Sequence, residues 1–152
     1  MSDFSIFMAG NTAKDEVVEY VASKRFGKPE LNKKGEPTGK IIPEPWKIKA
    51  ISSNLDEAIR KECTKRVPIV GKRGQYNQET DTDKYIGKMC AACTVYPNLN
   101  DAALQDHYGV KSADELLKAM LLAGEYTEYK AKVMEINGFD LSMEELVDEA
   151  KN

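Results

Sequence analysis

The residues best suited to chemistry in this 152-residue chain are three cysteines and a single histidine. Cys90 and Cys93 form a C-x-x-C pair, which in other proteins supplies half of a zinc site or a redox dithiol, and Cys63 with His107 would complete a Cys₃His set. The two residues between the cysteines of the pair are alanines inside an apolar helical pattern. We therefore expect Cys90 and Cys93 to pack one turn apart as small core residues, and we predict no metal or other cofactor.

No other group of residues predicts an active site. His107 falls near the end of a predicted helix, where a histidine complements the helix dipole, and no Ser or Cys near it lies in a nucleophile-elbow context. Residues 71–74 (GKRG) lack the spacing of a phosphate-binding loop. We predict that the protein is not an enzyme.

Two basic stretches could contact nucleic acid. They comprise Lys24, Arg25, Lys28, Lys33, Lys34 and Lys40 in the first stretch, and Lys65, Arg66, Lys72 and Arg73 in the second. Few aromatic residues accompany them, and the whole chain has 22 basic against 25 acidic residues, a net charge of −3. We favour a solubilising role for these lysines and keep a small nucleic-acid-binding accessory protein, using the basic loops, as the alternative function.

The N-terminal third of the chain is predicted to form β-structure. Residues 16–26 contain β-favouring side chains, and residues 45–51 alternate apolar and basic side chains, as in a strand with one buried face. Residues 27–43 hold three prolines and three glycines and are predicted as a flexible loop. The two strands would then pair as one antiparallel β-hairpin over residues 16–51.

The remainder, residues 53–152, is predicted to form five or six short helices, with a second loop over residues 70–80. The predicted helix starts share N-cap residues or capping boxes: Ser53 or Asn54, Asp81 to Asp83, Asn98, Ser112 with Glu115, and Ser142 with Glu145. Gly109 and Asn137-Gly138 indicate helix ends. The predicted fold class is α+β, mainly α, with an N-terminal β-hairpin followed by helices in a single domain over residues 1–152.

Several segments, taken in order, resemble one protein family. They are residues 23–26 (SKRF), 45–52 (PWKIKAIS), 96–106 (YPNLNDAALQD), 108–110 (YGV), 120–126 (MLLAGEY) and 136–139 (INGF). At these spacings the chain resembles, over nearly its whole length, the XkdN-like tail assembly chaperones of tailed phages and prophages.

The resemblance implies a helper protein that is absent from the finished virion. Such chaperones bind the tape measure protein, keep its long apolar helices soluble, and bring tail tube subunits to it. A groove between short amphipathic helices could hold an apolar segment of that kind. One short stretch has apolar side chains on nearly every side, contributed by Met120, Leu121, Leu122 and Tyr126. We expect these residues to form the face that binds the client or a second copy of the chain, the latter giving a homo-oligomer.

The sequence also bears on location. No apolar run approaches the roughly 18–20 residues that span a bilayer, the N-terminus lacks the features of a signal peptide, and an odd number of cysteines fits a reducing compartment. We expect the cytoplasm of a bacterial host. Residues 150–152 (AKN) can be encoded as a −1 slippery heptamer, which suggests a longer frameshifted form as a further partner, although Lys-Asn is as readily an ordinary polar ending.

Overall fold

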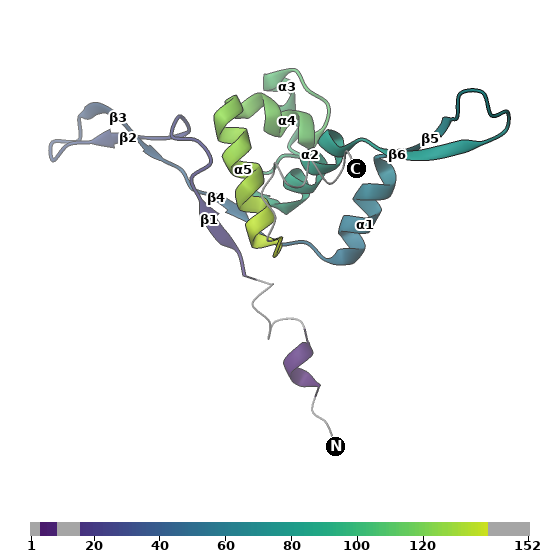
Figure 1. Ribbon diagram of the computed structural model, residues 1–152. Helices are drawn as coiled ribbons and strands as arrows, with labels where there is room; N and C mark the ends of the chain where they lie inside the picture. The colour runs from purple at the N-terminus through teal and green to yellow at the C-terminus, as the bar shows by residue number, and fades with distance from the viewer. Residues whose placement is uncertain (1–3, 9–15, 140–152) are drawn as a thin grey trace.

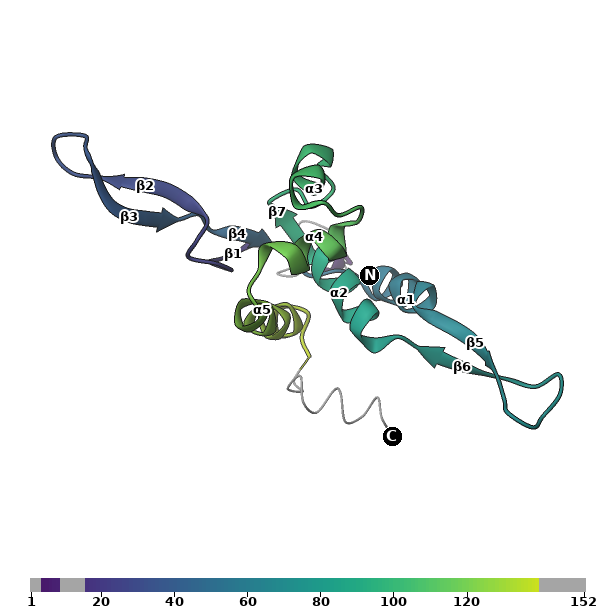
Figure 2. The same cartoon turned by 90° about the horizontal axis from the view of Figure 1, so that it is seen from above.

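The computed structural model describes residues 4–8 and 16–139 of the chain. Figure 1 shows a body of packed helices from which two β-hairpin arms extend on opposite sides, and Figure 2 shows the same arms from above. The first arm pairs β2 (Gly27–Leu31) with β3 (Pro37–Pro43), and the second pairs β5 (Thr64–Pro68) with β6 (Tyr76–Thr80). A short 3₁₀ turn, η1 (Ser5–Phe7), lies near the N-terminus.

The body also contains a small antiparallel sheet. Its strand order is β1-β4-β7, formed by Val18–Tyr20, Trp46–Ile48 and Thr94–Tyr96. The expected pairing of the 16–26 and 45–51 segments is confirmed, with Val18 opposite Ile48 and Tyr20 opposite Trp46. The two strands do not form a simple hairpin, because the whole first arm connects them and β7 pairs with the other edge of β4.

The predicted fold class is therefore wrong. The described residues contain five α-helices and seven strands in three sheets, and strands occur both before and between the helices. The predicted loop over residues 27–43 is the whole first arm, and the predicted loop over residues 70–80 contains strand β6 of the second arm. Both arms are two-stranded ribbons whose side chains face solvent on both sides, so their sequences lack the apolar alternation of a half-buried strand. Glycines with positive φ turn the chain at the two tips, at Gly35 and at Gly71 and Gly74.

The helices begin at or near the predicted N-cap residues. They are α1 (Ser53–Glu62), α2 (Thr82–Cys93), α3 (Ala102–Tyr108), α4 (Ala113–Met120) and α5 (Ala123–Ile136). The expected caps at Asp81 and Ser112 are confirmed, whereas α1 is capped one residue early by Ser52 and α3 three residues late by Asp101. Gly109, with φ of 68°, ends α3 in the left-handed conformation. The predicted Ser142–Glu145 capping box and residues 150–152 lie outside the described residues.

The core is built around α2, which packs against α1, α4, α5 and β7. Trp46 and Ile48 point inward from β4, and the Tyr129 ring from α5 meets the Trp46 ring edge-on with centroids 5.5 Å apart. The α2 side chains in this core are Ile86, Met89, Cys90 and Cys93. None of the helices in the described residues is long and apolar enough to cross a membrane.

Candidate functional site

The predicted chemistry-bearing residues lie in two different environments. All three cysteines are buried, and Cys90 and Cys93 lie on the inner face of α2, as expected. Burial raises the pKa of the Cys90 thiol to about 12, which keeps it protonated and unreactive near neutral pH. His107 is exposed on α3, with its ring edge-on to Tyr108 at 5.0 Å. Within residues 4–8 and 16–139, no three His, Cys, Asp or Glu side chains gather in a way that could hold a metal ion.

The four residues predicted to form a binding face are divided between core and surface. Met120 and Leu121 are each only 6% exposed, whereas Leu122 is 57% exposed at the start of α5. Tyr126 is half-buried, and the Lys130 ammonium lies 4.7 Å from its ring centroid. Of the four, Met120 lines an open groove on the surface.

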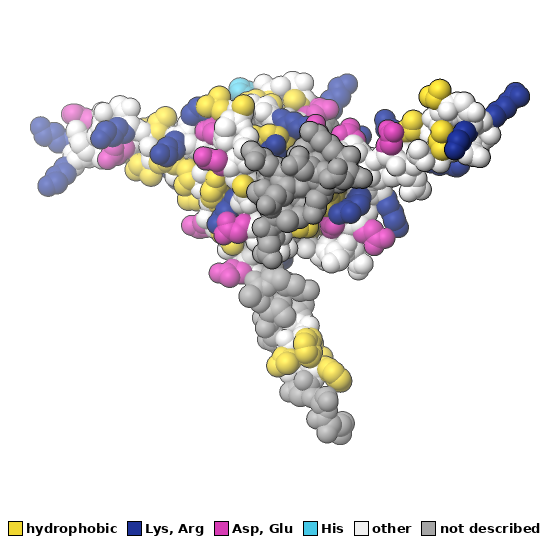
Figure 3. Space-filling view, viewed as in Figure 1, with side chains coloured by type: hydrophobic (Ala, Val, Ile, Leu, Met, Phe, Trp, Pro, Cys, Tyr) yellow, Lys and Arg dark blue, Asp and Glu magenta, His cyan; other side chains and the backbone are white. Residues whose placement is uncertain are grey.

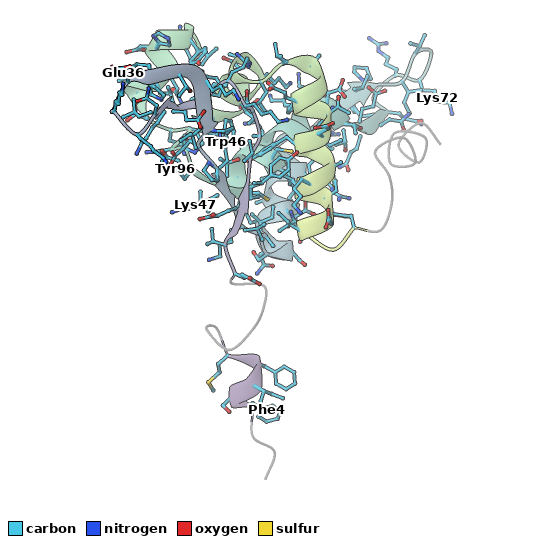
Figure 4. All side chains as sticks on the ribbon, turned by 90° about the vertical axis from the view of Figure 1, so that its left-hand side faces the viewer. Phe4, Glu36, Trp46, Lys47, Lys72 and Tyr96 are labelled. Carbon is cyan, nitrogen blue, oxygen red and sulfur yellow. The ribbon has the colours of Figure 1, made fainter. Side chains whose placement is uncertain are left out.

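We call this feature the arm-base groove, because it lies where the first arm joins the body. Its cavity volume is about 380 Å³. Its lining comes from the start of β2, from β4 and β7, and from α3 and α4: Phe26, Gly27, Lys28, Glu44, Trp46, Tyr96, Pro97, Leu104 and Met120. Figure 3 shows hydrophobic side chains gathered where the first arm meets the body, and Figure 4 places Trp46 and Tyr96 below the arm that carries Glu36.

Arg25 links two of the groove's lining residues, Phe26 and Met120, through its guanidinium group. Its guanidinium donates a hydrogen bond to the Met120 carbonyl oxygen at 2.6 Å and pairs with the Glu125 carboxylate at 3.1 Å. The same guanidinium lies 5.0 Å from the Phe26 ring centroid. One side chain thus connects the base of the arm to the end of α4 and the start of α5.

The sheet positions the groove's aromatic side chains. Lys47 of β4 lies opposite Tyr96 of β7, and the Lys47 ammonium is 6.0 Å from the Tyr96 ring centroid. The Tyr96 side chain is 44% exposed, whereas the nearby Trp46 is 2% exposed. The groove therefore combines an anchored, buried indole with an accessible phenol ring.

The apolar surface continues from the groove onto the arm. Ile42 of β3 lies directly opposite Lys28 of β2, and directly opposed residues of an antiparallel pair share one face. Because Lys28 lines the groove, Ile42 extends the same face outward, and its side chain is largely exposed. Lys28 and Glu44 supply one charge of each sign among otherwise apolar lining side chains. The groove therefore suits a mainly apolar ligand that has polar or charged groups along one side.

Of the residues that line the arm-base groove, our prediction from the sequence had named only Met120 for the binding face. Phe26, Tyr96, Pro97 and Leu104 are separated by up to 78 positions along the chain (104 − 26) and meet only after folding. A signal was nevertheless present, because all four occur in the segments 23–26 and 96–106 that carry the family resemblance.

Comparison with known proteins gives a consistent result. The family described as "Phage XkdN-like tail assembly chaperone protein" matches residues 4–151. The chain is 34% identical to the uncharacterized protein YqbN of Bacillus subtilis (strain 168), covering 99% of this chain and 93% of YqbN. It is 32% identical to the phage-like element PBSX protein XkdN of the same strain, covering 99% and 94%. The crystal structure of the protein YqbN superimposes with a TM-score of 0.67 at 30% identity, covering 92% of this chain and 99% of that one.

Proposed function

Since this chain belongs to the XkdN-like phage tail assembly chaperone family, we propose that it binds an apolar segment of the tape measure protein in the arm-base groove. In this proposal it acts in the host cytoplasm as a binding protein rather than an enzyme, brings tail tube subunits to the tape measure protein, and is absent from the mature virion. The observation that carries the proposal is an open apolar groove anchored by Trp46 and continued by Ile42 on a projecting arm.

The groove has the chemistry that an amphipathic helix needs. Such a helix presents apolar side chains three or four residues apart, and it is recognised by a hydrophobic groove that covers this stripe. Phe26, Tyr96 and Leu104 are partly exposed and would contact the stripe directly. Covering the stripe removes apolar surface from water, which stabilises the complex and prevents the client from aggregating.

Co-expression with the tape measure protein from the same gene cluster tests this proposal. The informative variants are Tyr96→Ser and Ile42→Ser, because these side chains are 44% and 56% exposed and neither belongs to the buried core. Val70→Ser is the matched control, since Val70 is 99% exposed near the tip of the second arm. We expect the first two variants to lose co-purification of soluble tape measure protein, by about tenfold or more for Tyr96→Ser.

Two results would contradict the assignment. If the Tyr96→Ser and Ile42→Ser proteins, folded by circular dichroism, kept the client soluble as well as the Val70→Ser protein, the client would bind elsewhere. If the wild-type protein failed to hold the tape measure protein at all, the proposed function itself would be wrong. Adding purified tail tube protein to the same pull-down tests the recruitment step, for which we expect a ternary complex.

A further inference from the structure

The first feature behind this inference is an apolar segment near the N-terminus. Phe4, Ile6, Phe7 and Met8 are each 60–72% exposed, and the Phe4 and Phe7 rings lie 6.4 Å apart across the η1 turn. Figures 3 and 4 show these side chains away from the body. We call residues 4–8 the N-terminal apolar segment. Four large apolar side chains exposed together within five residues are typical of a contact surface rather than of ordinary exposed residues.

The second feature is another groove, beside α1 and distinct from the arm-base groove. This α1 groove has a cavity volume of about 360 Å³. Its lining residues are Lys49, Ala50, Ile51, Ser52, Leu55, Ala92 and Val95. Two of its apolar lining side chains, Leu55 and Val95, are 43% and 50% exposed.

The α1 groove is preformed, because hydrogen bonds fix its backbone. The Lys49 N–H donates to the Cys93 carbonyl oxygen at 2.8 Å, and the Ile51 N–H donates to the Asn137 side-chain oxygen at 3.0 Å. The Ser52 hydroxyl caps α1 by accepting from the Leu55 N–H at 3.3 Å. A rigid groove binds a ligand without a further ordering cost.

The path of the chain brings the two features near each other. Val18, the first residue of β1, lies opposite Ile48, which directly precedes Lys49 and Ala50 of the groove. The chain before Val18 therefore joins the body beside the α1 groove. Eight residue steps separate Met8 from Glu16, a distance of at most about 28 Å.

We propose that the N-terminal apolar segment of one copy packs into the α1 groove of a second copy, and that the exchange is reciprocal. In a single copy the segment and the groove are both exposed. In a dimer the segment of each copy would cover the groove of the other, which gives a closed contact with twofold symmetry. Apart from Lys49 and Ser52 the lining side chains of the groove are apolar, as are the four large side chains of the segment. The arm-base groove takes no part, and this inference does not depend on the proposed client.

Light scattering after size-exclusion chromatography of the full chain tests the proposal. We expect a concentration-dependent species of twice the 17.0 kDa chain mass. The segment variant is Phe4→Ser with Phe7→Ser, and the groove variant is Leu55→Glu, which places a charge in the groove. Position 55 is the third residue of α1 after the N-cap Ser52, where a Glu completes a capping box, so this substitution should leave the helix folded. Each should weaken dimerisation by about tenfold or more. Val70→Ser, near the tip of the second arm, should leave it unchanged.

Mixing the two defective proteins separates exchange between copies from docking within one copy. The groove variant still has an intact segment, and the segment variant still has an intact groove, so an equimolar mixture should form a heterodimer through one of the two contacts. A wild-type protein that stays monomeric would overturn the proposal, as would a dimer unaffected by either variant or a mixture that forms no heterodimer.

Discussion

Cys90 lies on the inner face of α2 with no exposed surface, and its environment makes a measurable difference to its chemistry. The pKa of this thiol is raised to about 12 by burial and, to a lesser extent, by the neighbouring Cys93. The thiolate is the reactive form, so at pH 8 the folded protein should react with iodoacetamide on the order of 1,000-fold more slowly at Cys90 than the urea-unfolded chain. Mass spectrometry of the labelled peptides measures this ratio. Rapid labelling of Cys90 in the folded state would contradict its placement in the core.

The same thiol predicts a pH dependence of stability. The pKa of Cys90 is higher in the folded state than its ordinary value of 9.0, so the native protein holds this proton at a pH where the unfolded chain has lost it. Its contribution to stability is therefore complete below about pH 9 and decreases toward pH 12, by at most about 1.4 kcal/mol per pH unit. Urea unfolding at pH 8, 9 and 10 should show a steeper loss for wild type than for Cys90→Ala. Parallel curves for the two proteins would show that this thiol does not contribute.

At the scale of elements, two glycines give opposite predictions for the same substitution. A Cβ added at Gly27, at the base of the first arm, would lie 2.0 Å from the carbonyl oxygen of Ile42 on the opposite strand. A Cβ added at Gly124, in the first turn of α5, would meet nothing within 4 Å. We expect Gly27→Ala to separate the strands at the arm base, at a cost of about 1–3 kcal/mol, and Gly124→Ala to stabilise the protein by about 0.4–1 kcal/mol.

Hydrogen exchange together with urea unfolding checks both substitutions. Gly27→Ala should speed exchange of the β2 and β3 amides and, because Gly27 lines the arm-base groove, should also weaken client binding. Gly124→Ala should leave the arm's exchange unchanged. Equal exchange in the arm of the two variants would mean that the close approach at Gly27 relaxes without cost.

These elements also show which parts of the fold the sequence could predict. The starts of α2 and α4 were predictable because Asp81 and Ser112 satisfy free backbone N–H groups through local contacts. The arms were not predictable from apolar periodicity, because exposed two-stranded ribbons have no buried face. Strand β7 is three residues long and exists through its pairing with β4, a contact between distant parts of the chain. The same limit applies to the arm-base groove, where Met120 meets Phe26 and Tyr96 only in the folded protein.

At the scale of the whole molecule, the two arms present similar charges at opposite ends. Lys33 and Lys34 lie at the tip of the first arm, and Lys72 and Arg73 lie at the tip of the second. Figure 2 shows the arms extending in opposite directions from the body. These tips are the surfaces that the alternative function, nucleic-acid binding, would use. The arm-base groove lies at the other end of the first arm, so the two functions place their contacts on separable parts of the molecule.

Salt dependence distinguishes these two functions. Binding to nucleic acid releases counterions, so its affinity falls steeply with salt and the slope becomes smaller when contacting basic residues are removed. Contacts in an apolar groove respond little to screening, so we expect co-purification of the tape measure protein to persist at about 0.5 M NaCl, where the Debye length is below about 8 Å. It should also persist when Lys33, Lys34, Lys72 and Arg73 are all changed to Ser, which removes four charges from exposed tips without touching the core. Loss of the client in that variant, together with salt-sensitive DNA binding by the wild type, would move the functional surface from the groove to the arm tips. The opposite pattern, in which the tip variant keeps the client and Tyr96→Ser loses it at every salt concentration, is the one that the position of the groove predicts.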